Sequence, residues 1–301
     1  MSTRAATIGA AARAATITGP GDRHDRFAGY AFYAFLLLSL TVGFVTLAVL
    51  LVDVFRDGIP YLDGQLLTNA PSSSPERAGA RPAILASLYL GILIVAFSVP
   101  LGIGTAVYLE EYAHKERWYN RLLELNIQNL AGVPSIVYGI LGLAFVVRGL
   151  GLGRVLLAGA IILTLVVLPT VIVASREAIR AVPDSIRQGA FALGATKWQV
   201  VRRQVLPAAI PGIATGSILS VSRGIGETAP LLLVGALTFV SINPTLLGPY
   251  TALPIQIFQW ISRPQEEFKF LAAAAIIVLL LMLLTLNAFA IWLRTRYQKK
   301  W

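Results

Sequence analysis

Long apolar runs separated by short charged segments form the main pattern of this sequence. Six runs have the length of about 20 residues or more that a helix needs to cross a hydrocarbon layer about 30 Å thick. They lie near residues 28–52, 83–109, 125–147, 155–175, 206–240 and 270–293. Only the fifth run contains charged side chains, Arg223 and Glu227. The pattern predicts an all-α integral membrane protein with six transmembrane helices.

The composition agrees with a membrane location. Charged residues make up 13% of the chain, against about 25% in a soluble domain, and hydrophobic residues make up 56%. The chain has no cysteine, and its two histidines, His24 and His114, lie outside the apolar runs, so we expect no metal site. The net charge of +10 comes from basic residues that flank these runs without clustered aromatic side chains. We therefore expect no nucleic-acid partner.

Lysine and arginine near the ends of the runs predict the orientation, because they are enriched on the cytoplasmic side. They are most frequent in three segments, residues 1–27, 176–203 and 294–301. They are fewer in residues 53–82, 148–154 and 241–269. The charges of residues 110–124 nearly cancel, so the side of this loop follows only from alternation of the spans. Both termini are predicted to be cytoplasmic.

The segments between and beside the spans differ in character. Residues 1–27 predict a disordered cytoplasmic tail, and 28–52 the first helix. Residues 53–82 are rich in Pro, Ser and Gly, which predicts an irregular extracytoplasmic linker. Residues 241–269 are expected to contain a short helix that lies at the membrane surface or folds back into the bundle, and Tyr250 and Trp260 would suit a membrane interface. Residues 294–301 form a basic cytoplasmic tail.

The inner segment 176–207 predicts a helix, a bend and a second helix outside the membrane. Pro183 favours a helix start, and Gly194 favours the left-handed conformation that closes it. Thr196 and Gln199 have capping-box spacing, which predicts a second helix to about Gln204. An apolar side formed by Phe191, Leu193, Trp198, Val201 and Val205 indicates a docking element. The alternative is a solvated loop with local helix.

Glycines supply two further indications. Gly212 and Gly216 lie four residues apart and predict a close approach of two helices. Gly189 and Gly194 have the spacing of a phosphate-binding loop, but Ala195 and Thr196 follow where the ATP-binding motif needs Lys and Ser or Thr. The chain is therefore not expected to hydrolyse ATP by that route.

The inner segment resembles the inner-membrane permease family of binding-protein-dependent ABC importers. The cytoplasmic signature of that family is E-A-A, three residues, G, nine residues and I-x-L-P. Gly194, Leu206 and Pro207 fit it at the family spacing. Gln188 replaces the Glu, Gly189 the first Ala and Gln204 the Ile, while Ala190 is retained.

Three further stretches resemble the phosphate-uptake (Pst) branch of this family. They are GVPSIVYGILGL (132–143), AVYLEEYA (106–113) and SRGIGETAPLL (222–232). Thr228-Ala229-Pro230 is similar to the A-type permease of that branch rather than to the sister C-type. The resemblance covers about residues 83–293.

The resemblance implies a permease core of five helices in residues 83–293, with one extra N-terminal helix, in a bacterial or archaeal cytoplasmic (inner) membrane. The implied partners are a homologous C-type permease, two ATPase subunits and an extracytoplasmic phosphate-binding protein. ATP and Mg would be bound by the ATPase, which leaves this chain non-catalytic and without a cofactor. Residues 184–204 would be the coupling segment. Its contact residues would be Gln188, Gly189, Ala190, Gly194, Thr196, Lys197, Trp198, Leu206 and Pro207.

The charged pair in the fifth run is the candidate substrate site. Arg223 and Glu227 lie four residues apart, so they can meet on one helix face. Charged side chains at bilayer depth usually pair and often line a pathway. Arginine offers a planar fork suited to phosphate oxygens, and Glu227 would hold it when no anion is present. The alternative is an ion pair that only specifies helix packing.

Arg176 and Glu177, at the inner end of the fourth run, have two interpretations. They could form a second polar station at the cytoplasmic exit, or they could extend to the membrane interface as long charged side chains do.

Two other functions stay open on the sequence. The substrate could be another oxyanion, such as sulfate or molybdate. The chain could also be a secondary transporter or a membrane scaffold. A secondary transporter predicts inverted repeats and several acidic residues within spans, whereas Glu227 is the one acid deep within a run.

Overall fold

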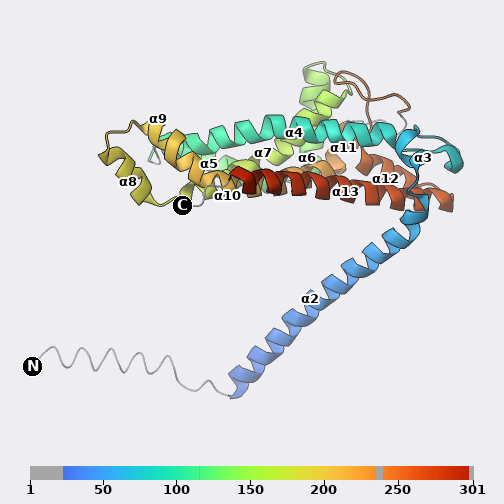
Figure 1. Cartoon of the computed structure of the whole chain (residues 1–301), viewed down its shortest axis with the longest axis horizontal. Coiled ribbons are helices and arrows are strands. Elements are labelled where there is room, and N and C mark those ends of the chain that lie inside the picture. The colour runs from blue at the N-terminus through green and yellow to red at the C-terminus, as the bar shows by residue number, and fades with distance from the viewer. Residues whose placement is uncertain (1–22, 115, 235–239, 298–301) are drawn as a thin grey trace, which may run out of the picture. The chain divides into compact units, whose positions relative to one another are not determined.

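The computed structural model describes residues 23–114, 116–234 and 240–297 (Figure 1). These residues form helices, turns and loops, with no strand among them. The chain divides into two units, residues 1–53 and 54–301. In the first unit the described residues belong to helix α2 (Arg23–Gly58), whose last residues continue into the second. Most of the predicted tail, residues 1–22, and the last four residues of the chain lie outside the described residues.

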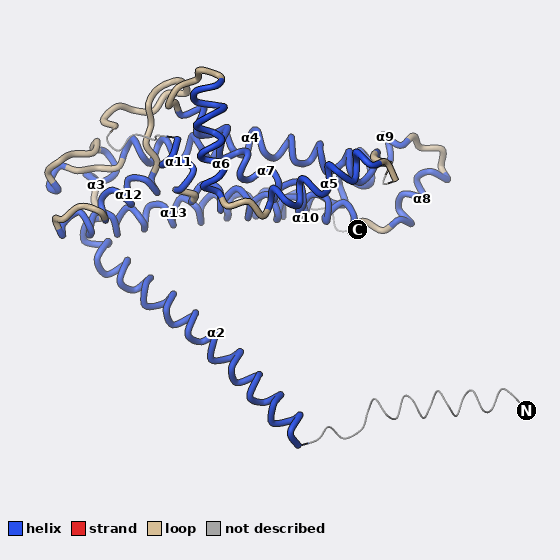
Figure 2. The backbone as a smooth tube through the Cα atoms, turned by 180° about the vertical axis from the view of Figure 1, so that it is seen from behind, coloured by secondary structure: helices blue, strands red, loops and turns tan. Residues whose placement is uncertain are grey.

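The second unit is a helical bundle that runs between two ends. Its helices are α3 (Gly64–Thr68), α4 (Arg81–Val107), α5 (Trp118–Ala131), α6 (Ser135–Gly142), α7 (Leu156–Arg180), α8 (Asp184–Ala192), α9 (Lys197–Val200), α10 (Leu206–Gly226), α11 (Ala229–Val234), α12 (Leu253–Ile261) and α13 (Glu266–Tyr297). Helices α8 and α9 lie at one end, and α3 and α12 at the other (Figures 1 and 2). We refer to these as the α8–α9 end and the α3–α12 end.

Within the described residues, five helices are long and apolar enough to cross a membrane. The predicted span at 125–147 is instead broken into α5 and α6, which are bent by 105° relative to each other. The break has a local cause: α5 ends at Gly132, and Pro134 lacks an N–H and disfavours a helical conformation at Val133. Counting this pair as one span gives the six that the apolar runs predict.

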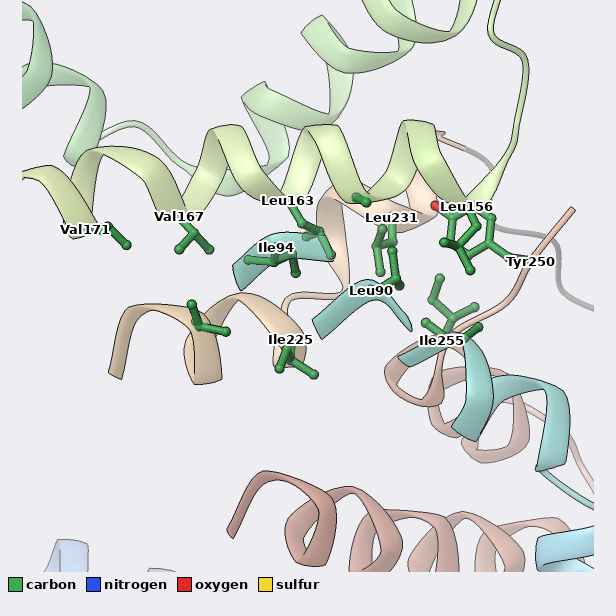
Figure 3. Close-up of a cluster of buried hydrophobic side chains, with 14 residues drawn as sticks. Leu90, Ile94, Leu156, Leu163, Val167, Val171, Ile225, Leu231, Tyr250 and Ile255 are labelled. Atoms are coloured by element: carbon green, nitrogen blue, oxygen red, sulfur yellow. The ribbon is translucent and has the colours of Figure 1, made fainter. Parts of the chain in front are cut away.

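The core forms where α4, α7 and α10 pack together. Along α7, Leu156, Leu163, Val167 and Val171 face Leu90 and Ile94 of α4 and Ile225 of α10 (Figure 3). Helices α4 and α7 run in the same direction, because Gly102 lies against Val171 and Glu110 against Arg176. Helix α10 runs the opposite way.

Small residues let α10 approach α7 closely. A Cβ atom added at Gly212 would lie 2.8 Å from Cβ of Ala178, and one added at Gly216 would collide with Ala174. The close helix approach predicted from these two glycines is confirmed. Two residues before the end of α10, Gly224 likewise leaves room for Val167.

The α3–α12 end is more ordered than its composition suggests. Residues 59–80, predicted to be irregular, contain α3 and two 3₁₀ turns, Ile59–Tyr61 and Pro75–Arg77. The side chain of Asp63 caps α3 by accepting the Leu66 N–H at 2.8 Å. Leu66 is fully buried and belongs to one cluster with Trp260 of α12 and Phe268 of α13.

Two aromatic residues expected at the membrane interface are buried instead. Tyr250 and Trp260 are each 1% exposed. Tyr250 lies against Gly159, where a side chain would leave it no room, and this burial raises the pKa of its hydroxyl group. Of the two predicted placements the structure has the second, because α12 and the loop before it fold back onto α4, α7 and α13. The two aromatic side chains are therefore covered and do not face outward as an interfacial belt requires.

Candidate functional site: a helical elbow and a charged cavity

The α8–α9 end is an elbow made of a helix, a bend and a second helix. Helix α8 begins at Asp184, directly after Pro183. Gly194 has φ +79°, a conformation that glycine adopts at little cost. Thr196 caps α9: its hydroxyl accepts the Gln199 N–H, and the Gln199 side chain accepts the Thr196 N–H at 2.8 Å. The predicted bend and capping box are confirmed.

The second helix does not stop near Gln204 as predicted. It continues through a π-helical turn, Val201–Val205, directly into α10, so that Lys197–Gly226 is one span of 30 residues. The wider hydrogen-bond spacing of this turn carries the chain past Pro207, which has no N–H to donate. Val200 and Val205, packed with Ile179 and Ala209, hold the turn in place.

The predicted apolar side of the elbow divides into two parts. Val201 and Val205 are buried in the bundle, whereas Phe191, Leu193 and Trp198 are exposed at the tip. Among the other residues of the predicted coupling segment, Gln188, Gly189, Gly194, Thr196 and Lys197 are exposed or half-buried at the tip, and Ala190, Leu206 and Pro207 are half-buried. The tip therefore presents large apolar side chains together with small and polar ones.

Arg176 lies in a buried ion-pair network rather than at the membrane interface. Its Nη2 atom is 2.8 Å from Oε1 of Glu110 and 2.6 Å from Oε1 of Glu124. Arg180 binds the same oxygen of Glu110 at 2.8 Å. Arg176 does not extend outward as a long side chain reaching for an interface would, because two carboxylates hold it within the bundle.

The structure does not bring Arg176 and Glu177 together. Glu177 is exposed and pairs with Arg180 at 3.2 Å. Neighbouring residues on a helix point about 100° apart, so the two side chains face different surroundings. Arg176 contributes to the packing of α4, α5 and α7, while Glu177 remains on the surface.

A second ion pair joins α8 to the end of α4. Arg187 donates to Oε1 of Glu111 from Nε at 3.1 Å and from Nη2 at 3.0 Å. It also donates to the backbone carbonyls of Ile179 and Val182 at 2.9 and 2.6 Å. These carbonyls belong to the last turn of α7 and the residues just after it, and the Ile179 carbonyl also accepts the Val182 N–H at 3.2 Å.

The charged pair Arg223 and Glu227 meets, as its spacing predicts, although not within one helix. Helix α10 ends at Gly226, and Glu227 has extended backbone angles. The Nε atom of Arg223 is 3.5 Å from Oε1 of Glu227. The side chain of Arg223 is largely exposed, and that of Glu227 is mostly buried. The pair therefore lies where α10 ends, and its polar side chains can line a space beside the helix.

A cavity opens beside this pair. It lies between the break of α5 and α6, the middle of α7 and the end of α10, and it is lined by Leu130, Ala131, Val133, Ser135, Tyr138, Val166, Val167, Thr170, Ser220, Arg223, Gly224 and Glu227. The hydroxyls of Tyr138, Thr170 and Ser220 donate to the carbonyls of Leu130, Val167 and Gly216. Ser135 supplies a fourth hydroxyl, and the guanidinium group of Arg223 is the cationic donor of the lining. Among the described residues no group of acidic or histidine side chains could hold a metal.

Comparison with known proteins identifies the family. Residues 98–300 match the family described as binding-protein-dependent transport system inner membrane component. The chain belongs to this family. It is thus a multi-pass inner-membrane protein and a permease of an ABC importer, and the resemblance to phosphate-branch permeases is confirmed. The family consists of non-catalytic transmembrane subunits that work with an ATPase and a binding protein.

Individual relatives agree with this assignment. The chain is 31% identical to a probable ABC transporter permease protein, YqgI, of Bacillus subtilis, over 84% of this chain and 92% of the relative. It is 32% identical to the phosphate transport system permease protein PstA of Yersinia pestis, over 84% and 85% of the two chains. The fold is that of a bacterial ABC transporter involved in alginate import, with a TM-score of 0.63 at 17% identity, covering 92% of this chain and 99% of that one.

The permease also contains paired residues that the sequence analysis missed. The sequence indicates Glu110, Glu111 and Glu124 only as charges that cancel in the loop 110–124. Their partners are Arg176, Arg180 and Arg187, between 52 and 76 residues away. The sequence does contain one indication of these pairs. The loop 110–124 holds four glutamates and the segment 176–203 holds six basic residues, and two such segments predicted on the same side of the membrane can pair.

Proposed function

We propose that this chain is a permease subunit of an ATP-driven importer of inorganic phosphate. It forms half of the translocation pathway with a homologous C-type permease, and two ATPase subunits and an extracytoplasmic phosphate-binding protein complete the assembly. Residues 83–293 are the permease domain, and residues 184–204 the coupling segment. The α8–α9 end and both termini face the cytoplasm. The names of the relatives support phosphate as the cargo.

The observation that carries this proposal is the position of Arg223 in the cavity. Its side chain projects from the end of α10, and three of the four hydroxyls in the lining, those of Tyr138, Thr170 and Ser220, donate their hydrogens to backbone carbonyls. Arginine presents fixed N–H groups that match two oxygens of a phosphate ion. An arriving anion therefore meets one strong cationic donor.

Glu227 moderates this attraction. With 3.5 Å between Nε and Oε1, it holds Arg223 in place and lowers the net positive field. Conduction requires an attraction that is strong enough for entry and weak enough for release. The pair meets both requirements, because phosphate competes with an internal carboxylate for the same guanidinium group.

The break between α5 and α6 adds a second electrostatic attraction for an anion in the cavity. Because α5 ends before Pro134, the first turn of α6 begins at Ser135, on the wall of the cavity. Helix N-termini carry a partial positive charge and attract anions. This field supports the binding role of Arg223, although it does not replace it.

The elbow provides the connection to the ATPase. Its tip exposes Leu193 and Trp198, and large apolar side chains at a tip favour a protein partner. ATP and Mg are bound by that partner. Closure of the ATPase pair would move the elbow and, through α7 and the continuous helix Lys197–Gly226, the wall of the cavity.

The test is ATP-dependent phosphate uptake by the assembled transporter in vesicles. We expect Arg223→Gln to lower uptake at least tenfold and Arg223→Lys to retain part of it, since lysine keeps the charge but not the fork. Glu227→Gln should change the phosphate concentration needed for half-maximal uptake. Arg77→Gln, which removes an exposed arginine at the α3–α12 end, is the control for net charge.

Competition identifies the cargo. Excess sulfate or molybdate should leave uptake of labelled phosphate unchanged, whereas unlabelled phosphate should abolish it. Unchanged uptake in both Arg223→Gln and Glu227→Gln would reduce the pair to a packing role. Competition by sulfate or molybdate as strong as that by phosphate would reject the assignment of the substrate.

A further inference from the structure

One short turn at the end of α4 contacts three helices of the α8–α9 end. The π-helical turn Tyr108–Tyr112 follows α4 without interruption. Three consecutive side chains of this turn each hold a different helix. Glu110 binds Arg176 and Arg180 of α7, Glu111 binds Arg187 of α8, and the Tyr112 ring lies 5.1 Å from Nζ of Lys197 at the start of α9.

We propose that Glu111 and Arg187 form the rigid joint through which movement of α8 reaches α4 and α7. In this role Arg187 is a positioning residue: it contacts neither the transported ion nor ATP, but it keeps the elbow at a fixed angle to the two helices. The inference rests on the proposed function, because it requires an ATPase docked on the elbow. It goes further by assigning the transmission step to one pair of side chains.

The contacts of Arg187 fix it from several directions. Its guanidinium group donates to Glu111, at the end of α4, and to the carbonyls of Ile179 and Val182, in the last turn of α7 and just beyond it. The linker between α7 and α8 consists of Ala181, Val182 and Pro183. Helix α8 also packs through Ala190 against the cluster that contains Val200 and Val205. Without Arg187, α8 would keep this packing and the linker but lose its polar link to α4 and α7, and its angle could change without moving those two helices.

Burial makes this pair stronger than its neighbours on the elbow. The side chain of Glu111 is 9% exposed and that of Arg187 16% exposed, so water and salt compete weakly with the contact. Asp184 also pairs with Arg187, at 3.0 Å, but is 84% exposed. Exposed ion pairs contribute little to the stability of a contact. Arg187 thus has two acidic partners, the buried Glu111 and the exposed Asp184, and substitution of Asp184 is a matched control for substitution of Glu111.

Glu110 has a different role in the same turn. One of its oxygens is shared by Arg176 and Arg180, both on α7, so it joins α4 to α7 and does not reach α8. The contact of Tyr112 with Lys197 lies on the surface, where cation–π contacts are weak. Among the three consecutive contacts, that of Glu111 is therefore the one that both reaches the elbow and is shielded from water.

The experiment measures the phosphate transported per ATP hydrolysed by the assembled transporter in vesicles. We expect Glu111→Gln and Arg187→Gln to lower this ratio at least tenfold while ATP hydrolysis continues. Asp184→Asn should leave the ratio within twofold of the wild type. The double variant Glu111→Gln/Arg187→Gln should have a ratio no lower than that of the more damaging single variant, because each single substitution already breaks the same contact.

A tether provides the test that does not depend on the loss of a charge. The chain contains no cysteine, so Glu111→Cys/Arg187→Cys places two unique thiols in it. Before cross-linking, the double variant should show a low ratio. A short bifunctional thiol reagent that spans the two positions should raise the ratio at least fivefold, because a covalent tether restores the fixed angle.

Three outcomes would overturn the inference. One is an unchanged ratio in Glu111→Gln and Arg187→Gln, and another is an equal loss in Asp184→Asn. The third is a parallel fall of transport and hydrolysis that the tether does not reverse, which would leave the pair a purely structural role. If the wild-type complex bound no ATPase or carried no phosphate, the proposed function itself would fail.

Discussion

The carboxylate of Glu124 lies 2.6 Å from Nη2 of Arg176, so one charge pair ties helix α5 to helix α7. The same arginine also binds Glu110, and both partners of that second contact are almost fully buried, at 7% and 5% exposure. Three helices therefore meet at one guanidinium group. Loss of this group leaves the buried carboxylate of Glu110 with Arg180 as its remaining partner.

We predict that Arg176→Gln strongly destabilises the fold. Breaking a buried ion pair by removing one partner costs about 3–5 kcal/mol. Arg180→Gln is the control, since Arg180 binds the same Glu110 oxygen but is 49% exposed, so that water can replace part of its contact and the loss of stability should be smaller. The measurement is the melting temperature of the purified chain in detergent. Equal shifts for the two variants would contradict the role given to burial.

A second prediction concerns the contact of α10 with α7. Gly216→Ala places a methyl group against Ala174, and overpacking of this kind costs about 1–3 kcal/mol. Gly104→Ala on α4 is the control, because nothing lies within 4 Å of the added methyl group. There the substitution should stabilise the helix by about 0.5–1 kcal/mol. Thermal unfolding should thus shift in opposite directions for the two glycines.

A third prediction separates conformation from space at the elbow. Gly189 and Gly194 both have open space where an alanine methyl group would lie, but only Gly194 has a positive φ. Gly194→Ala should destabilise the bend by about 1–2 kcal/mol, the cost of a left-handed conformation for an L-residue. Gly189→Ala, within α8, should be neutral or slightly stabilising. Melting temperatures of the two variants decide the matter, and identical values would show that the bend tolerates other angles.

A fourth prediction distinguishes two tryptophans. Trp260 is buried in the α3–α12 end, and Trp260→Ala should cost about 3–5 kcal/mol of stability. Trp198 is exposed on the elbow, so Trp198→Ala should leave the melting temperature unchanged. Under the proposed function it should instead weaken retention of the ATPase during purification. Undiminished retention of the ATPase in Trp198→Ala would count against docking at the elbow.

A fifth prediction tests the orientation. In this cysteine-free chain, Leu193→Cys should react with a membrane-impermeant thiol reagent only when the cytoplasmic face is open to it. Ser73→Cys, in the segment before α4, should react only from the opposite face. Oriented membrane vesicles supply the measurement. Labelling of both positions from one side would reject the proposed topology.

Local chemistry in the sequence is enough to predict a large part of the fold. The apolar runs indicate the spans because length and composition alone decide whether a helix suits the membrane. Gly194, Thr196 and Gln199 indicate the elbow because a bend and a cap depend on a few neighbouring residues. The contact of Arg223 with Glu227 is predicted from a spacing of about one helical turn, although Glu227 lies just past the end of α10.

Other features could not be predicted from the sequence. Some depend on residues far apart in the chain, and one is a break within an apolar run that is long enough to cross the membrane. Glu111 and Arg187 are 76 residues apart, and nothing in their neighbourhoods specifies the partner. Tyr250 and Trp260 have the composition of an interface but are covered by other helices. The break at Pro134 is visible as a proline within an apolar run, yet a run of sufficient length predicts a crossing whether or not it is straight.

The unbroken helix from Lys197 to Gly226 has a geometric consequence for the candidate site. At 1.5 Å per residue its 30 residues form a rod about 45 Å long, with the elbow at one tip and Arg223 near the other. Under the proposed function, a tilt of about 10° around the elbow would move a point about 45 Å away by about 8 Å, since displacement grows with distance from the pivot. A small rotation at the base is thereby magnified into a stroke large enough to widen or narrow the mouth of the cavity.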